Sequence, residues 1–300
     1  MPTAQALPAR TTYLGMLEIR RALPIRERRM IGPWCFLDRY GPLSFSDAKP
    51  MDVAPHPHIG LQTVTWLLEG EVLHRDSLGS ESLIRPGELN VMTSGRGISH
   101  SEETPRGNSG RLSGVQLWVA LPDADRNQPA SFEHHDDLPR MESPAGNFIV
   151  FSGAAAGLRS SASAYSQMTG AEITIHAGQR MLFPLDITFE YGVMLVSGEA
   201  QLGEERLEID TLYYLAPGDD ALTISTRAGG KLLLLGGVPF DEPIFMWWNF
   251  VARTAAEIAE AQREWNARED SERFGKVSGY NGSRINAPPF PLRVPPPPAS

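Results

Sequence analysis

The chain has 300 residues, with 27 Lys and Arg against 36 Asp and Glu, and a formal net charge of −9 at pH 7. This balance, without a long basic block, argues against a protein that binds nucleic acid directly, because phosphate backbones require clustered positive charge. The single cysteine, Cys35, excludes an internal disulfide framework and a zinc site built from several cysteines. We expect Cys35 to be a small buried apolar residue.

The N-terminal residues 1–5, MPTAQ, lack a basic segment followed by an apolar core, and no run of the sequence approaches 18 apolar residues. We therefore expect a soluble, cytoplasmic protein that does not enter a membrane. The densest basic patch is interleaved with Glu27 and apolar residues, and we expect it to form a solvated strand or turn face. It comprises Arg20, Arg21, Arg26, Arg28 and Arg29.

Glycine and proline together contribute 53 of the 300 residues, about 18%. Their share in average usage is about 12%. This composition favours short strands and tight turns, and hence an all-β fold. Residues 61–90 follow this pattern, with turns expected at 70–71, 77–80 and 86–87, and strands continue to Val119. Both faces of the strand at 63–68 are largely apolar, as the wall of a barrel or sandwich requires.

A second run of strand-like segments covers residues 171–239, after a polar stretch at 123–144 that is typical of a domain junction. In each half a Gly-Glu pair precedes a Pro-Gly pair: 70–71 and 86–87 in the first, 198–199 and 217–218 in the second. This repetition predicts two similar β units in tandem. We divide the chain into domains at 1–136 and 137–287, followed by a proline-rich tail at 288–300.

Near the C-terminus the pattern changes from strand to helix. Thr254 and Glu257 have capping-box spacing, and Ile258, Ala261 and Trp265 fall on one helical face. The spacing predicts an amphipathic helix over 254–268, with Trp265 in the core. The tail holds seven prolines and is typical of polyproline or disordered structure.

Two pairs of polar residues share the same spacing. His56 and His58 are two residues apart, and so are His100 and Glu102, 42 residues after His58. Side chains two apart on a strand project to the same face, so three imidazoles and one carboxylate can converge. Such a donor set suits Fe(II), Mn, Ni, Co or Cu better than a structural zinc site, and would leave two positions of an octahedral ion open.

The remaining histidines fit structural or exposed positions. We expect His74 to be structural or exposed, and His134 and His135 to lie in an exposed loop. His176 has no partner histidine in its segment, so the second unit is expected to lack a metal. The sequence contains no nucleophile-elbow, phosphate-loop or dinucleotide motif. The glycines at 94–97 are expected to let the chain turn sharply and return His100 to the core.

Two long strings resemble the pirin family of the cupin superfamily: HPHIGLQTVTWLLEGEVLHRDSLG at 56–79 and IRPGELNVMTSGRGISHSEE at 84–103. The segments at 32–38 and 248–251, with the helix after them, are also similar. The resemblance implies two tandem cupin domains, each a double-stranded β-helix or jelly roll, packed face to face, with a short C-terminal helix. It also implies a mononuclear iron in the N-terminal domain, held by His56, His58, His100 and Glu102.

The chain departs from the family pattern at one position. Pirins often have Glu four residues after the second histidine, where this chain has Gln62. A neutral amide cannot supply a carboxylate ligand, so Glu102 would be the sole acidic ligand. We expect Fe(II), with Mn, Ni, Co, Cu or Zn as alternatives.

The resemblance implies two activities. The first is quercetin 2,3-dioxygenase chemistry on a flavonol or related enol, with O₂ as co-substrate; for this reaction we assign Glu102 as the catalytic base, because it is the only carboxylate of the ligand set. The second is an iron-dependent, redox-sensing protein that binds and regulates a transcription factor or metabolic enzyme. A storage or structural protein with a vestigial site is a third interpretation, which requires the four ligands to be coincidental.

Overall fold

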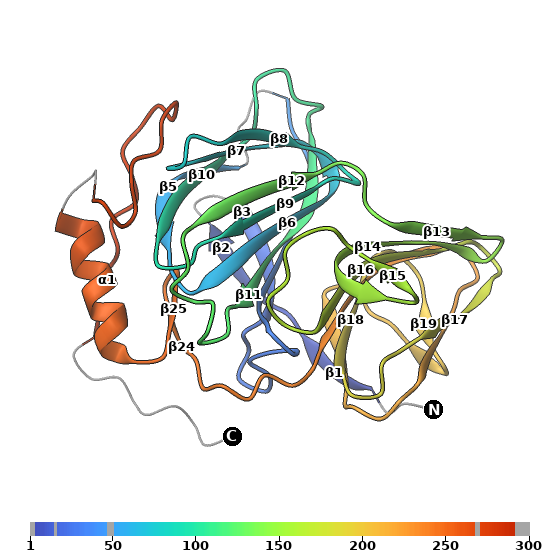
Figure 1. Ribbon diagram of the computed structural model, residues 1–300. Helices are drawn as coiled ribbons and strands as arrows, with labels where there is room; N and C mark the ends of the chain where they lie inside the picture. The colour runs from blue at the N-terminus through green and yellow to red at the C-terminus, as the bar shows by residue number, and fades with distance from the viewer. Residues whose placement is uncertain (1–3, 15–16, 47–50, 268–270, 292–300) are drawn as a thin grey trace.

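The computed structural model describes residues 4–14, 17–46, 51–267 and 271–291. Figure 1 shows two strand-rich units side by side, with one helix on the outer flank of the first unit. The all-β prediction is confirmed, because the described residues form 25 strands and a single helix. That helix is too short to cross a membrane.

The described residues of the first unit form two antiparallel sheets whose strands do not pair with each other. The larger has the order β12 (Ser131–His135), β9 (Leu89–Thr93), β6 (Leu61–Gly70), β11 (Arg111–Ala120), β4 (Trp34–Ser44), β3 (Leu17–Leu23) and β2 (Arg10–Leu14). The smaller has the order β5 (Asp52–His58), β10 (Ile98–Glu103), β7 (Val72–Asp76) and β8 (Glu81–Ile84). The turns predicted at 70–71, 77–80 and 86–87 lie between these strands and are confirmed.

The second unit repeats this arrangement. Its larger sheet has the order β1 (Gln5–Pro8), β21 (Thr211–Leu215), β18 (Glu190–Gly198), β23 (Gly230–Gly237), β16 (Met168–Ile175), β14 (Gly146–Ala155) and β13 (Arg140–Ser143), with β15 (Leu158–Arg159) paired to β14. Its smaller sheet has the order β17 (Arg180–Pro184), β22 (Ala221–Ser225), β19 (Gln201–Leu202) and β20 (Glu205–Arg206). The tandem repeat predicted from turn residues is therefore present.

The two sheet orders also show which turns correspond. The Gly-Glu pairs are equivalent, since 70–71 joins β6 to β7 and 198–199 joins β18 to β19. The Pro-Gly pairs are not: 86–87 joins β8 to β9, whereas 217–218 lies one connection later, between β21 and β22. The repeat was correctly predicted, but one of its two supporting correspondences was a coincidence.

Both ends of the chain cross between the units. Strand β1 pairs with β21 in the second unit, although it precedes the whole first unit in sequence. After the second unit, the hairpin of β24 (Phe245–Trp247) and β25 (Phe250–Ala252) returns to the first, where Phe250 bridges Ile59. The proposed division at 136–137 falls between β12 and β13 and stays a prediction. It assigns the C-terminal segment to the second domain, whereas the contacts of that segment are with the first.

Helix α1 (Ala255–Ala267) begins at the predicted capping box. The backbone N–H of Thr254 donates to Glu257 Oε2 at 3.2 Å, and the backbone N–H of Glu257 donates to Thr254 Oγ1 at 3.3 Å. Ile258, Ala261 and Trp265 are its buried residues, as predicted. The last residue of the predicted helix, 268, and the tail from 292 onward lie outside the described residues.

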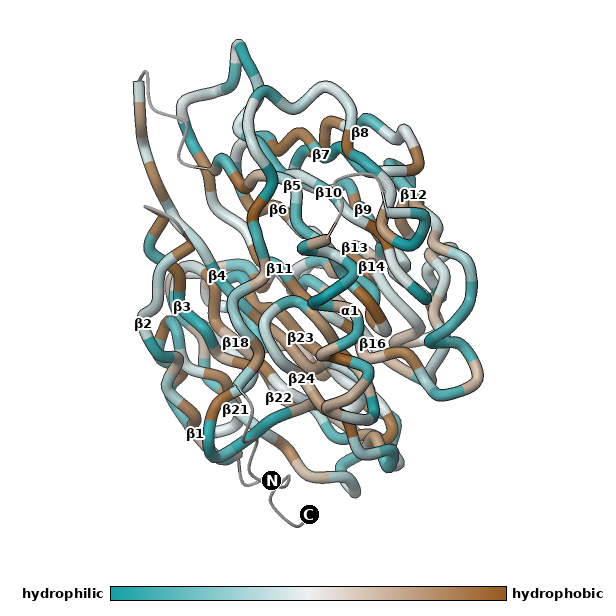
Figure 2. The backbone as a smooth tube through the Cα atoms, turned by 90° about the vertical axis from the view of Figure 1, so that its left-hand side faces the viewer, coloured by the Kyte–Doolittle hydropathy of each residue, from teal (hydrophilic) through white to brown (hydrophobic). Residues whose placement is uncertain are grey.

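One hydrophobic cluster takes residues from both units. Figure 2 shows that hydrophobic residues are concentrated in the interior strands. This cluster is the largest of the buried ones. Trp34 is fully buried in it, and its indole N–H lies 3.0 Å from the carbonyl of Thr169 and 3.2 Å from that of Gly236. Cys35 is fully buried as predicted, and burial raises the pKa of its thiol to about 12.

Candidate metal centre

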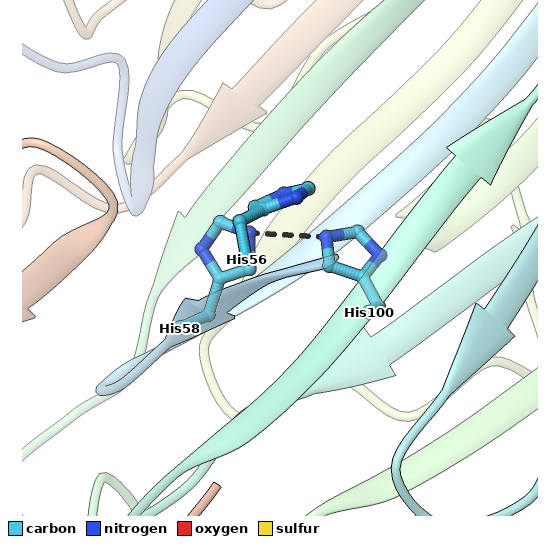
Figure 3. Close-up of side chains that lie close together, drawn as sticks. All are labelled: His56, His58 and His100. Carbon is cyan, nitrogen blue, oxygen red and sulfur yellow. Dashed lines mark hydrogen bonds between the residues drawn. The ribbon is translucent and has the colours of Figure 1, made fainter. Parts of the chain in front are cut away.

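Three histidines converge on the inner face of the smaller sheet of the first unit. His56 and His58 lie on β5, and His100 lies opposite His56 on the neighbouring strand β10. Strand β5 is an edge strand, which accommodates Pro55 and Pro57 because one side of an edge strand needs no N–H donors. Figure 3 shows the three rings pointing toward one another.

The turn before His100 depends on glycine, as expected. Gly95 has a φ of 49°, and a Cβ there would lie 2.0 Å from the carbonyl oxygen of Gln128. Only glycine fits this position without moving the backbone. The turn at 94–97 therefore returns the chain directly into β10.

The three imidazoles form a compact buried group. One ring nitrogen from each lies within 4.8 Å of the others, and the Nε2 atoms of His58 and His100 are 3.1 Å apart. Backbone carbonyls fix two of the rings: His56 Nδ1 lies 2.9 Å from the oxygen of Ala54, and His58 Nδ1 lies 3.0 Å from that of Asn249. A carbonyl can only accept, so each Nδ1 carries the proton and each Nε2 presents a lone pair.

A fourth histidine, His74, lies behind His100 and contacts the carboxylate of Asp76 in turn. Nδ1 of His100 lies 3.3 Å from Nδ1 of His74, and His74 Nε2 lies 3.3 Å from Oδ2 of Asp76. Burial tends to raise the pKa of Asp76, but hydrogen bonds from His74 and Ser80 outweigh burial and lower it. Asp76 is therefore ionised, and His74 donates to it through Nε2.

This direction of hydrogen bonding brings two unprotonated nitrogens face to face, an arrangement that a bound cation would stabilise. When His74 carries a single proton, directed at Asp76 from Nε2, its Nδ1 offers a lone pair to the Nδ1–H of His100, and Nε2 of His100 is then unprotonated. It faces the equally unprotonated Nε2 of His58 at 3.1 Å. Two imidazole nitrogens at this separation fit neighbouring positions on one ion with bonds of about 2.1 Å. The donor set, all imidazole and without thiolate, suits a borderline divalent metal.

Burial also holds the three rings neutral. It lowers the pKa of His56 to about 4 and lowers the pKa values of His58 and His100 well below the ordinary 6.5, with the neighbouring histidines adding to the effect on these two. Neutral imidazole is the form that binds metal. The centre is therefore ready for a cation at neutral pH without prior loss of protons.

We expect the metal-free protein to lose stability as the pH falls from 6.5 to 4. In this window an unfolded chain protonates His56 and the folded chain does not, so the free energy of unfolding rises with pH. For His56 alone the loss is up to about 3 kcal/mol, at about 1.4 kcal/mol per pKa unit. Urea unfolding of wild type and His56→Gln at pH 7.0, 5.5 and 4.5 isolates this contribution. Parallel pH profiles for the two proteins would contradict it.

Glu102 is the fourth predicted ligand, and it lies near the histidines but not among them. It follows His100 by two residues on β10 and lines the same cavity, whereas the close group contains the three histidines alone among the described residues. Thr65 Oγ1 lies 3.3 Å from its Oε1. Burial raises the pKa of the Glu102 carboxyl above its ordinary value.

Gln62, at the position where the family often has Glu, points away from the centre. Its amide nitrogen donates to Thr93 Oγ1 at 3.0 Å and to the carbonyl of Ser163, in the second unit, at 3.1 Å. It therefore helps to join the units rather than to build the site.

The histidines open onto a cavity of about 480 Å³ between the two sheets, within the size range of small-molecule pockets. Opposite them, the larger sheet presents two cross-strand rows, Trp118 beside Phe36 and Gln116 beside Asp38, and Tyr40 lines the cavity beyond them. The first row is a stacked aromatic pair with ring centroids 4.0 Å apart, and the Trp118 ring meets the edge of His58 at 5.2 Å. The cavity thus has an aromatic wall beside the histidines.

One expectation about the basic patch was wrong. Arg21 does not lie on a solvated face, because it lines the cavity, contacts Asp38 through two hydrogen bonds of 2.7 and 2.6 Å, and lies over the Phe36 ring. Its partner Asp38 is 17 residues later and reaches it only through the β3–β4 pairing.

The hairpin β24–β25 closes one side of the cavity through Met246, Trp248 and Asn249. Trp248, at the tip, has a φ of 53°, which is unusual for a bulky residue. The same turn supplies the Asn249 carbonyl that fixes His58. The C-terminal segment is therefore part of the site.

We expect Trp248→Gly to be more stable than Trp248→Ala by about 1 kcal/mol, because both remove the ring but only glycine adopts a positive φ without strain. Urea unfolding of the two variants measures the difference. Equal stabilities would mean that Trp248 does not hold this conformation in solution.

The structure decides one prediction about histidines and corrects another. His74, expected to be structural or exposed, is buried and joined to His100, in agreement with the structural alternative. His134 and His135 belong to strand β12 rather than a loop, although His134 is exposed. The sequence contained a sign that His74 belongs to the site. His74 and Asp76 are two residues apart, the same spacing as in the pairs already identified.

The fold and the buried histidines define a protein of two tandem cupin domains with a candidate metal centre in the first. Residues 16–119 match the family described as Pirin, and residues 170–271 match the Pirin C-terminal cupin domain. The chain belongs to the pirin family.

Several relatives resemble this chain over most of its length. A Pseudomonas aeruginosa protein named "Putative quercetin 2,3-dioxygenase" is 43% identical over 97% of this chain and 91% of its own length. A pirin-like protein of Caulobacter vibrioides is 38% identical over 86% of this chain and 91% of its own. A crystal structure of quercetin 2,3-dioxygenase from Acinetobacter baumannii is 41% identical, covers 97% of both chains and superposes with a TM-score of 0.92.

Proposed function

We propose that this protein is a metal-dependent dioxygenase of the quercetin 2,3-dioxygenase type, which cleaves a ring of a flavonol or related enol with O₂. The observation that supports it most is the group of three inward-facing Nε2 atoms at a cavity with an aromatic wall. The names of the relatives from Pseudomonas aeruginosa and Acinetobacter baumannii support the same substrate class.

In this proposal His56, His58, His100 and Glu102 hold one divalent ion, with Fe(II) first and Mn, Ni, Co, Cu or Zn as alternatives. When bound, the ion supplies Lewis-acid and redox chemistry for the reaction with O₂. The neutral imidazoles are donors suited to this role.

The side chains around the ion orient the substrate and accept its proton. Phe36 and Trp118 offer a flat apolar surface on which an aromatic ring can stack. Glu102, on the same strand as His100, is the only carboxylate of the proposed ligand set, and it accepts the proton of the enol hydroxyl when its coordination to the ion is loose. The buried walls limit water at the reacting carbon, which strengthens these electrostatic effects.

The test is simultaneous loss of quercetin absorbance and uptake of O₂ by protein that is stripped and reloaded anaerobically with each metal. We expect turnover in the reloaded wild type and a 100- to 10,000-fold lower rate in Glu102→Gln at full metal occupancy, the usual contribution of a general base of about 10² to 10⁴. Unchanged turnover in this variant would remove the catalytic role of Glu102.

A different outcome would overturn the proposal as a whole. If one metal binds per chain and neither quercetin nor O₂ is consumed, the dioxygenase proposal fails. The remaining hypothesis is then iron-dependent, redox-sensitive binding to a transcription factor or metabolic enzyme, which a pull-down with and without iron would test. The cytoplasmic location stays a prediction in both cases.

A further inference from the structure

Behind the three histidines lies a buried pair that the proposed reaction does not use. His74 and Asp76 are 3% and 1% exposed, and both lie on β7, directly beside β10. In the register of these strands Asp76 faces His100 and His74 faces Glu102. The pair therefore lies against the strand that carries two of the four proposed ligands.

The two carboxylate oxygens of Asp76 have different hydrogen-bond partners. Oδ1 accepts hydrogen bonds from the backbone N–H groups of Leu78 and Ser80, at 2.9 and 3.0 Å. Oδ2 is thereby left to face Nε2 of His74 at 3.3 Å. The His74 ring is also stacked on Phe132, with centroids 4.4 Å apart, which limits its rotation.

These contacts give the chain of hydrogen bonds a single direction. An ionised carboxylate only accepts, so a singly protonated His74 carries its proton on Nε2 and presents Nδ1 as an acceptor. His100 must then donate through Nδ1, 3.3 Å away. The proton on Nδ1 leaves Nε2 of His100 free to bind a cation.

We propose that Asp76, acting through His74, is a positioning residue that holds His100 in the tautomer able to bind metal. The inference rests on the proposed role of His100 as a ligand. An imidazole whose N–H donates to a fixed acceptor binds metal more strongly through its other nitrogen, so His74 and Asp76 are expected to increase metal affinity as well as to orient the His100 ring.

Asp76→Asn reverses the chain with little change of shape. Because Leu78 and Ser80 hold the oxygen at Oδ1, the amide nitrogen of Asn must face His74. An amide N–H donates, so His74 must accept at Nε2 and donate from Nδ1, and His100 must then carry its proton on Nε2. That nitrogen can no longer bind metal without a rearrangement.

The first measurement is Zn(II) affinity, by competition with a chromophoric chelator. We expect Asp76→Asn to bind Zn(II) 10- to 100-fold more weakly than wild type, the usual effect of removing a partner of a metal-ligating histidine. Asp186→Asn is the matched control, because Asp186 also accepts a backbone N–H at 2.9 Å in a turn, but in the second unit. It should bind Zn(II) with unchanged affinity.

The second measurement reports tautomers without metal. Long-range ¹H–¹⁵N NMR should place the His100 proton on Nδ1 in the metal-free wild type and on Nε2 in Asp76→Asn. If wild type binds no metal, the proposed ligand role fails while these spectra still decide the inference. A His100 tautomer that is the same in both proteins would overturn it.

A second variant covers failure of Asp76→Asn to fold. His74→Phe keeps the stack on Phe132 but removes the acceptor for His100. We expect a similar 10- to 100-fold loss of Zn(II) affinity. Wild-type affinity in a folded His74→Phe protein would show that His100 needs no partner behind it, and would overturn the proposal.

Discussion

His56→Ala should lose nearly all bound metal while the protein remains folded. The His56 nitrogen is one of three that converge within 4.8 Å, so its removal leaves too few donors on one side of the ion. A partner of a ligand contributes about 10- to 100-fold in affinity, so the ligand itself should contribute more than 100-fold. The fold should persist because the core clusters are apolar and include none of these histidines.

Metal content after dialysis, measured by mass spectrometry beside circular dichroism, checks this expectation. His176→Ala is the control, since His176 is exposed in the second unit. Retention of stoichiometric metal in folded His56→Ala would remove His56 from the ligand set. A variant that loses its strand spectrum would show that the ion, rather than the apolar core, holds the fold together.

Trp34→Ala should destabilise the protein by about 3 to 5 kcal/mol, the usual cost of deleting a fully buried tryptophan. Its ring packs against Phe151 of the second unit at a centroid distance of 6.4 Å, and its N–H bonds two carbonyls there. The variant leaves a cavity between the units and removes the donor that Trp34 offers to two carbonyls. The loss should therefore weaken the junction rather than one unit alone.

Urea unfolding followed by circular dichroism measures this loss, with exposed Leu182→Ala as the control that should change stability by less than about 0.5 kcal/mol. We expect Trp34→Ala to lower the midpoint of a single transition. A change below about 1 kcal/mol would contradict the view that the shared core stabilises the pair of units.

The centre was predictable from sequence where the chemistry follows strand periodicity. His56 and His58 share a face because side chains alternate along a strand, and His100 joins them because a glycine turn returns its strand to the same sheet. The capping box at Thr254 likewise predicted the start of the helix from local residues alone. These predictions needed only spacing and turn chemistry.

Other features depend on contacts that no local pattern encodes. Arg21 lines the cavity because a neighbouring strand brings Asp38 to it, and the carbonyl that fixes His58 comes from Asn249, 191 residues later. The crossing of strand β1 into the second unit has no signal in the residues 5–8 themselves. Glu102 illustrates the remaining limit, since strand spacing places it near the histidines but does not fix the direction of its carboxylate.

The most direct test of the proposed metal centre is an anomalous-diffraction map of crystals loaded anaerobically with Fe(II) and soaked with quercetin. We expect one iron peak per chain, about 2.1 Å from nitrogens of His56, His58 and His100, with flavonol density against Phe36 and Trp118. The map would also show whether a Glu102 oxygen completes the set. An iron peak elsewhere, or none at the three histidines, would contradict the proposed centre.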